Sequence, residues 1–129
     1  MIQIAIISER EQDQKTICAL LSSQEDFIIA GIGSSGYDAL KYTADLHPDI
    51  IIMDLWMSDI YGTDLAPIIK RKSPMTGLIA LSFADNPGLV NQALRAGISG
   101  FLLKQSDMDK LPAAVRTVFY GGYYFSTPV

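Results

Sequence analysis

The chain has 129 residues, of which 49% are hydrophobic and 19% charged, so its length and composition fit one globular domain. Its net charge of -4 argues against gripping a nucleic-acid backbone, and its one cysteine, Cys18, excludes an internal disulfide and fits a small core residue. No apolar run approaches the ~18 residues of a membrane span, and the N-terminus lacks the pattern of a secretion signal. We therefore expect a cytoplasmic protein that does not contact a membrane.

Short apolar runs, each typical of a buried strand, alternate along the chain with segments of helical spacing. The expected strands are residues 2–7, 27–32, 49–53, 78–81 and 101–103, and helical spacing is seen around residues 17–21, 37–46, 65–69, 89–94 and 111–119. Apolar strands that are each followed by a helix indicate a parallel sheet covered on both faces. The sequence therefore predicts an α/β, flavodoxin-like, doubly wound domain with five helices and five parallel strands in the order 2-1-3-4-5.

Helix-boundary residues agree with this phasing at several places. Asn86 is expected to cap a helix whose first residue is Pro87. If Asp64 is taken as a cap, Pro67 falls at the third helical position, where its missing amide hydrogen costs little. Pro112 falls early in the last helix, so we expect an irregular or late start there.

Polar side chains follow four of the expected strands, and their chemistry suits a phosphoryl group. Ser8 and Glu9 follow the first strand, Asp54 the third, Ser82 the fourth and Lys104 the fifth. In the predicted sheet these positions converge at one edge, where open α/β sheets bind ligands. Carboxylates with a backbone carbonyl suit Mg²⁺, while an ammonium and a hydroxyl can hold phosphoryl oxygens. The plainer interpretation is that these residues only mark where strands leave the core.

Two stretches carry a family resemblance that covers essentially the whole chain. Asp-Leu-Trp-Met at residues 54–57, followed by Gly62, and the run of residues 96–104 that ends in Lys104 resemble the receiver domain of two-component response regulators, whose fold is CheY-like. Residues 113–118 and 121–128 resemble the last receiver helix and linker start of LuxR/NarL-type transcriptional regulators. The resemblance implies that residues 1–129 are a receiver domain. It also implies that residues 121–129 begin a linker to a helix-turn-helix output domain.

The resemblance also implies roles for individual residues. Asp54 would accept phosphate from a sensor histidine kinase, and Lys104 and Ser82 would contact the phosphoryl group. Mg²⁺ would be held by Glu9, Asp54 and the Trp56 backbone carbonyl, with Ser8 as a further candidate, and Phe101 would be the aromatic switch. A homodimer through the last helices is expected, with DNA bound only by the C-terminal output domain.

Four residues depart from the family pattern. Ser8 stands where an acid is usual, so we expect weaker Mg²⁺ binding. Phe83 replaces a very small residue and either crowds the phosphoryl position or points away. Ser58 replaces a proline and is expected to loosen the loop after Asp54. Gln105 also replaces a proline that many receivers have.

Other functions stay open on the sequence alone. Ser8 and Phe83 are compatible with a pseudo-receiver, an interaction module without phosphate chemistry. An aspartyl-phosphate hydrolase would need an acid two residues after Asp54, where Trp56 stands instead as a shield against hydrolysis or a partner-facing aromatic. The acidic loop after the first strand disfavours a flavin phosphate, and His47, the one histidine, is assigned a structural role.

Overall fold

A six-stranded parallel sheet forms the centre of the computed structural model, which describes residues 1–126. The strands run in the order β2-β1-β3-β4-β5-β6. They are β1 Ile2–Ile7, β2 Phe27–Gly33, β3 Ile50–Asp54, β4 Gly77–Ser82, β5 Gly100–Leu103 and β6 Tyr124–Phe125. The helices are α1 Glu11–Ser22, α2 Gly36–Leu46, α3 Gly62–Lys72, α4 Pro87–Arg95 and α5 Leu111–Phe119, with a 3-10 turn at Met108–Lys110.

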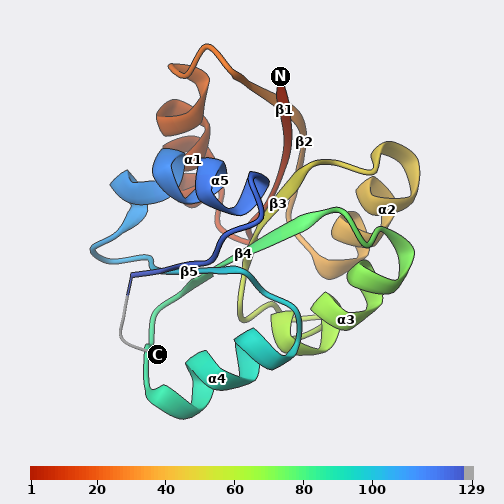
Figure 1. Cartoon of the computed structure of the whole chain (residues 1–129), viewed down its shortest axis with the longest axis vertical. Helices are drawn as coiled ribbons and strands as arrows, with labels where there is room; N and C mark the ends of the chain where they lie inside the picture. The colour runs from red at the N-terminus through yellow and green to blue at the C-terminus, as the bar shows by residue number, and fades with distance from the viewer. Residues whose placement is uncertain (127–129) are drawn as a thin grey trace.

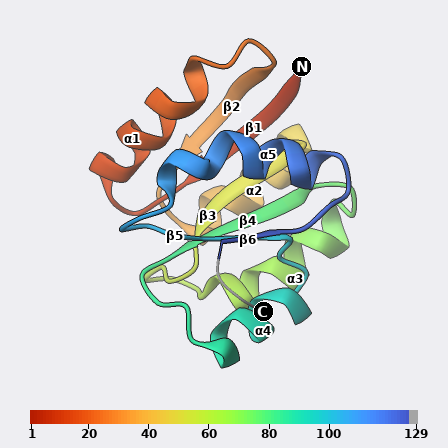
Figure 2. The same ribbon diagram turned by 60° about the vertical axis from the view of Figure 1, so that its left-hand side comes forward.

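The helices cover both faces of the sheet, as Figures 1 and 2 show. Helices α1 and α5 pack on one face, and α2, α3 and α4 pack on the other. Successive strand residues alternate between the two cores: Ile50 and Ile52 of β3 face the α1/α5 side, while Ile51 and Met53 face the α2/α3/α4 side. Because both faces are buried, the strands must be apolar throughout, which explains the continuous apolar runs.

The predicted fold class is confirmed, and the order 2-1-3-4-5 holds for the first five strands. The predicted number of strands is wrong by one, because β6 pairs in parallel with β5. A two-residue strand is too short to show a hydrophobic period in the sequence. Part of the segment expected to begin a linker is thus part of the sheet, while residues 127–129 of that segment lie outside the described residues.

Two of the three helix-boundary predictions hold. The Asn86 side chain accepts a hydrogen bond from the Leu89 amide at 2.9 Å, so it caps α4 with Pro87 as the first residue. The last helix starts irregularly, as expected: the 3-10 turn precedes α5, and Pro112 lies in its first two positions.

The prediction that Asp64 caps α3 is wrong. The helix begins at Gly62 after Tyr61, which places Asp64 in the first turn and Pro67 inside the helix. The early start follows from a bridge between Trp56 and Tyr61 and from the hydrogen bond of the Gly62 amide to the Leu55 carbonyl at 2.6 Å. A Cβ on Gly62 would lie 3.1 Å from the Leu55 Cα, so a residue without a side chain lets the two segments approach.

The C-terminal strand is attached to β5 by more than its ladder. The Phe125 ring stacks on Phe101, with centroids 6.1 Å apart. The Ser126 hydroxyl donates a hydrogen bond to the buried Asp107 carboxylate at 2.7 Å. Asp107 also accepts bonds from the Leu103 amide and from Lys110. One carboxylate therefore connects the last strand to the loop that precedes α5.

Asp107 should make stability depend on acid. Burial acts to raise the pKa of Asp107, but the hydrogen bonds from Ser126, Leu103 and Lys110 outweigh it and hold the pKa below the ordinary aspartate value. A carboxyl whose pKa is lower in the folded state contributes stability above its unfolded pKa, which is lost as the pH falls through the folded pKa. Asp107→Asn should therefore lower the melting temperature most near neutral pH, and the difference from the parent should narrow below about pH 4.

Thermal melts across that pH range measure this difference. Asp109→Asn is the matched control, since Asp109 is exposed two residues away. A gap between Asp107→Asn and the parent that stays constant with pH would contradict the role assigned to this carboxylate.

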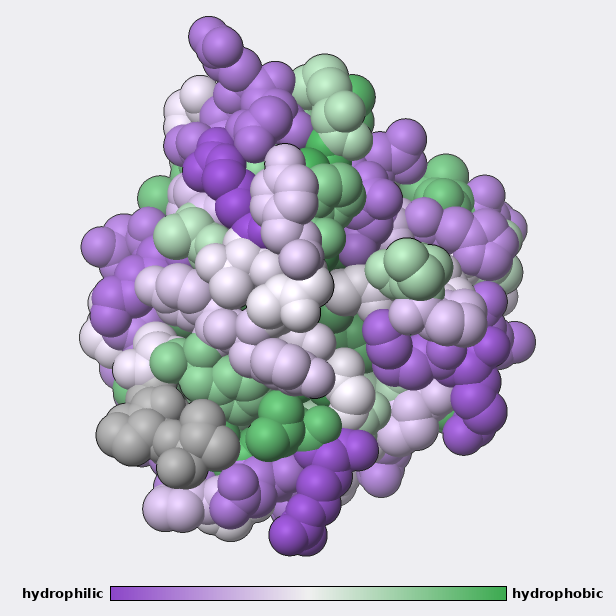
Figure 3. Space-filling view, viewed as in Figure 1, coloured by the Kyte–Doolittle hydropathy of each residue, from purple (hydrophilic) through white to green (hydrophobic). Residues whose placement is uncertain are grey.

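The surface in the view of Figure 1 is mixed in character. Figure 3 shows hydrophilic side chains along much of the margin, with apolar groups between them, and further apolar surface in the lower part of the view. Leu94 of α4 and Phe83 just before that helix are among the exposed large apolar residues. Within residues 1–126, none of the helices combines the length and the apolar character that crossing a membrane requires.

Candidate functional site

Asp54, the last residue of β3, is the centre of the site. Its side chain is only 4% exposed. Oδ2 accepts hydrogen bonds from the Ser8 hydroxyl and from the Glu9 amide, each at 3.0 Å. Both donors follow β1, which is the neighbour of β3 in the sheet. The parallel sheet thus brings residues 46 and 45 positions apart into contact at its carboxyl edge.

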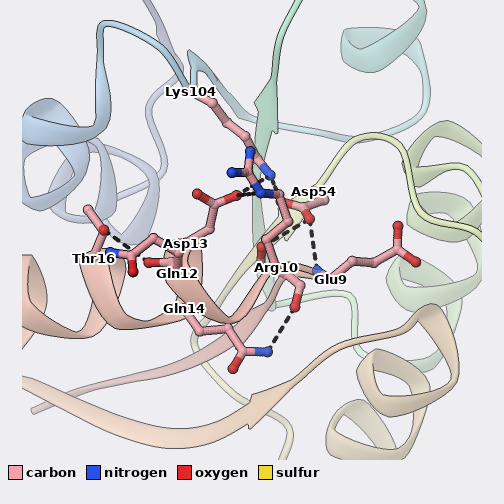
Figure 4. Close-up of polar contacts among 9 residues, drawn as sticks. Glu9, Arg10, Gln12, Asp13, Gln14, Thr16, Asp54 and Lys104 are labelled. Atoms are coloured by element: carbon pink, nitrogen blue, oxygen red, sulfur yellow. Dashed lines mark hydrogen bonds and ion pairs between the residues drawn. The ribbon is translucent and has the colours of Figure 1, made fainter.

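Lys104 completes this arrangement from the end of β5. Its Nζ lies 2.7 Å from Asp54 Oδ1, and its side chain is 6% exposed. Oδ1 is buried and accepts no hydrogen bond of standard geometry within the described part of the chain, so its partner is the charge of the ammonium. A buried carboxylate is costly without a cation, so Lys104 compensates the charge of Asp54. Of the predicted group of Ser8, Glu9, Asp54, Ser82 and Lys104, the Ser8 hydroxyl, the Glu9 amide and the Lys104 ammonium contact the Asp54 carboxylate. Figure 4 shows Lys104 and the Glu9 backbone beside Asp54.

The Glu9 carboxylate lies apart from Asp54. It points away from Asp54 in Figure 4, and its Oε2 accepts hydrogen bonds from the amide of Ser58 at 3.0 Å and from the Ser58 hydroxyl. The neighbouring Asp59 accepts bonds from the first two amides of α2, those of Gly36 and Tyr37. Ser58 was expected to loosen this loop, but its contacts tie the loop to the end of β1.

Ser82 is the last residue of β4, and Phe83 begins the loop that leads to α4. The buried Ser82 hydroxyl donates to the Ala84 carbonyl at 2.7 Å and accepts from the Ala84 amide at 3.1 Å, so it is bonded to the loop after β4 and not to Asp54. The Phe83 ring is half exposed, and Lys104 Nζ lies 5.0 Å from its centroid, where a cation is attracted to the ring. Gln105 donates to the Phe83 carbonyl at 3.1 Å. These contacts hold the loop against the end of β5.

The two aromatic candidates lie in different surroundings. Phe101 of β5 is fully buried, and its side chain is part of the core between the sheet and helices α2, α3 and α4. Trp56 is 42% exposed on the loop after Asp54.

His47 and Cys18 lie away from this edge of the sheet. His47 follows α2 in the left-handed conformation, and its Nδ1 lies 3.3 Å from the Ser73 hydroxyl. Cys18 is half-buried against the α1/α5 core, where burial raises the pKa of its thiol.

Sequence reasoning missed one member of the site, Asp13. This residue lies in the first turn of α1, and its Oδ2 accepts a hydrogen bond from Lys104 Nζ at 2.8 Å (Figure 4). The two residues are 91 positions apart. The sequence could have indicated Asp13, because it lies four residues, about one helical turn, after Glu9. A side chain at that position can reach the same edge of the sheet.

The carboxylates of Asp54 and Glu9 are ligands of the kind that Mg²⁺ prefers, but the two carboxylates do not lie together in this structure. Within residues 1–126, no group of three His, Cys, Asp or Glu side chains is arranged to hold a metal. The buried Asp54 Oδ1 has no hydrogen bond within the described residues, so it is available as a metal ligand. The Glu9 amide bonds to Asp54, so the backbone of Glu9 lies at the same edge of the sheet. Glu9 could join Asp54 only after its carboxylate leaves Ser58.

Comparisons with known proteins agree with this geometry. The family model for the response regulator receiver domain matches residues 4–116. The regulatory protein DegU of Brevibacillus brevis is 30% identical over 99% of this chain, and VraR of Staphylococcus epidermidis is 31% identical over 99%. DesR of Bacillus subtilis is 32% identical over 94% of this chain. The chain spans 54% to 61% of the length of these relatives.

Solved structures show the same fold. The receiver domain of NarL from Mycobacterium tuberculosis has a TM-score of 0.87 at 25% identity and covers 93% of this chain and 97% of its own. The receiver domain of RcsB from Escherichia coli has a TM-score of 0.89 at 23% identity, with 98% of each chain covered. The chain therefore belongs to the response regulator receiver domain family, and its relatives are regulators of the LuxR/NarL type.

Proposed function

We propose that this receiver domain is a phosphorylation-controlled switch in which Asp54 accepts a phosphoryl group from a sensor histidine kinase. The observation that carries the proposal is the buried ion pair of Asp54 and Lys104 at the carboxyl edge of the sheet, 2.7 Å apart. Lys104 would bind the oxygens of a group carried on Asp54, and its contact with the Asp54 carboxylate supports this role. Phosphoryl transfer asks mainly for such positioning and charge compensation, which these two residues supply.

Mg²⁺ is the implied cofactor, since receiver domains generally bind it at an acidic site. When bound, it would neutralise the charge that develops on the phosphoryl oxygens. Asp54, Glu9 and the Trp56 carbonyl would hold it, with Ser8 as a weaker candidate because its hydroxyl already donates to Asp54. The bonds of Glu9 to Ser58 compete with this role, which supports the expectation of weak metal affinity.

The switch would run from Asp54 through Ser82 to Phe101. Phosphorylation adds about -1.5 to -2 charge at Asp54, a strong acceptor for the Ser82 hydroxyl. To reach it, Ser82 must give up its bonds to Ala84, which would move the loop between β4 and α4. Phe101 lies on β5 beside β4 and would respond to that movement.

The partners follow from the relatives. Response regulators of this type act with a sensor histidine kinase and with DNA through an output domain. For this chain we expect DNA contact only through such a domain outside the 129 residues. The exposed Leu94 and Phe119 on α4 and α5 support homodimerisation through the last helices. As in receiver domains of transcriptional regulators generally, no enzymatic turnover of a separate substrate is assigned.

Acetyl phosphate with Mg²⁺ tests the proposal directly. We expect intact mass spectrometry to show the addition of one phosphoryl group, and fluorescence of Trp56, the one tryptophan, to change with beryllofluoride. Asp54→Asn removes the acceptor with little change in shape and should abolish both signals. Asp59→Asn is the matched control, because Asp59 lies on the loop that follows Asp54 but bonds to α2, and it should keep both. A parent chain indistinguishable from Asp54→Asn would overturn the proposal.

A pseudo-receiver is the second candidate, and one set of contacts favours it. Three groups near Asp54 are bonded to other partners: the Glu9 carboxylate to Ser58, the Ser82 hydroxyl to Ala84 and the Phe83 ring to Lys104. A chain fixed in this state would act as an interaction module. The experiment with acetyl phosphate separates the two functions, because the pseudo-receiver gives no mass change at any Mg²⁺ concentration.

A further inference from the structure

Lys104 is shared between two carboxylates, and the second comes from α1. Its Nζ lies 2.7 Å from Asp54 Oδ1 and 2.8 Å from Asp13 Oδ2. The Asp13 side chain is 15% exposed, so this contact is largely removed from solvent. Figure 4 shows the Lys104 ammonium between the two aspartates. An ammonium has three donors, and here two of its directions are taken by carboxylates.

The position of Asp13 is fixed by its surroundings. The next residue, Gln14, donates to the Ser8 carbonyl at 2.8 Å and to the Gly33 carbonyl at 3.1 Å, which attaches the start of α1 to the ends of β1 and β2. Arg10 is the other cation near Asp13, but it is 62% exposed and its Nε lies 4.0 Å away. Exposed pairs at such distances contribute little, so Lys104 is the main partner of Asp13.

A phosphoryl group on Asp54 would need the same ammonium. The phosphoryl group would bring about -1.5 to -2 charge next to Lys104. The phosphoryl group and the Asp13 carboxylate would then both lie beside the one Lys104 ammonium. We propose that Asp13 is a positioning residue that holds Lys104 beside Asp54 in the unphosphorylated chain and competes with the phosphoryl group for the ammonium. The inference rests on the proposed function of Asp54 as phosphoacceptor. Asp13 thereby sets the donor concentration at which the domain switches.

The two ligands of the site should respond to Asp13 in opposite directions. Removing its negative charge favours an anion and disfavours a cation nearby. Asp13→Asn should therefore lower the beryllofluoride concentration for half-maximal response by about fivefold at saturating Mg²⁺. It should raise the Mg²⁺ concentration for half-maximal response at saturating beryllofluoride. A merely structural loss of the α1 contact would weaken both, so the split between the two titrations identifies the charge.

The experiment titrates beryllofluoride and Mg²⁺ separately, with Trp56 fluorescence as readout. Asp13→Glu keeps the charge on a longer stem and should return both midpoints toward the parent. Asp45→Asn makes the same change in net charge at an exposed position of α2 and should leave both midpoints unchanged. Circular dichroism of each variant establishes that it is folded.

The titrations distinguish the role of Asp13 from the function of Asp54 as phosphoacceptor. If the parent responds and Asp13→Asn matches Asp45→Asn, or loses affinity for both ligands, the role of Asp13 is overturned and the phosphoacceptor function stands. If neither the parent nor Asp13→Asn responds to any concentration of beryllofluoride, both fail. A response that appears only in Asp13→Asn supports the competition in its strongest form.

Discussion

Lys104→Met should lower the free energy of unfolding by about 3 kcal/mol, because it leaves the buried Asp54 carboxylate without its cation. Methionine retains much of the apolar stem but removes the contacts at 2.7 and 2.8 Å to Asp54 and Asp13. Asp54, whose side chain is 4% exposed in the parent chain, then keeps only the Ser8 hydroxyl and the Glu9 amide as partners. Urea denaturation at neutral pH measures the loss.

A double-mutant cycle assigns this loss to charge rather than to packing. Lys104→Met combined with Asp54→Asn should regain more than half of the lost stability, since the main uncompensated charge is gone. Lys15→Met is the matched control: Lys15 pairs with Glu11 at 3.4 Å, but both side chains are more than two-thirds exposed. That variant should stay within about 0.5 kcal/mol of the parent. An equally small effect of Lys104→Met would show that the buried pair does not stabilise the fold.

Ser58→Pro should raise the affinity for Mg²⁺ by about tenfold. The substitution removes the amide hydrogen and the hydroxyl that hold the Glu9 carboxylate, so Glu9 is free to turn toward Asp54. Two hydrogen bonds to a charged group at an exposed site contribute about 1 to 2 kcal/mol, and 1.4 kcal/mol corresponds to a factor of ten in affinity. A Mg²⁺ titration followed by Trp56 fluorescence measures the change.

Two further variants locate the effect. Ser58→Ala keeps the amide hydrogen and should give an intermediate affinity. Ser23→Ala removes a hydroxyl at the C-terminal end of α1 and should leave Mg²⁺ binding unchanged. If Ser58→Pro binds Mg²⁺ no better than Ser23→Ala, then the contact with Ser58 does not restrain Glu9 from the metal.

The parts of this molecule that the sequence predicts well are those fixed by backbone geometry. The apolar runs determine the strands, and a parallel sheet places the residues that follow them at one edge. Asp54 and Lys104 were located in this way, and their ion pair confirms that they meet. Asn86 and Pro87 were placed by the equally local chemistry of a helix start.

The parts that were missed depend on side-chain orientation and on distant pairs. Glu9 follows β1 as predicted, but its carboxylate turns to Ser58 because two donors of the loop after Asp54 lie within reach. Asp13 meets Lys104 only through the packing of α1 against the sheet, which no local period reveals. The start of α3 was misjudged because the bridge between Trp56 and Tyr61 outweighed the capping preference of Asp64.

The stacking of Phe125 on Phe101 has a consequence for how a signal could leave the domain. The two rings are parallel to within 11°, and Ser126 donates to the Phe101 carbonyl at 3.3 Å as well as to Asp107. A rotation of the Phe101 ring would remove the surface on which Phe125 rests. The attachment of β6 to the edge of the sheet would then change with the conformation of the core beneath it.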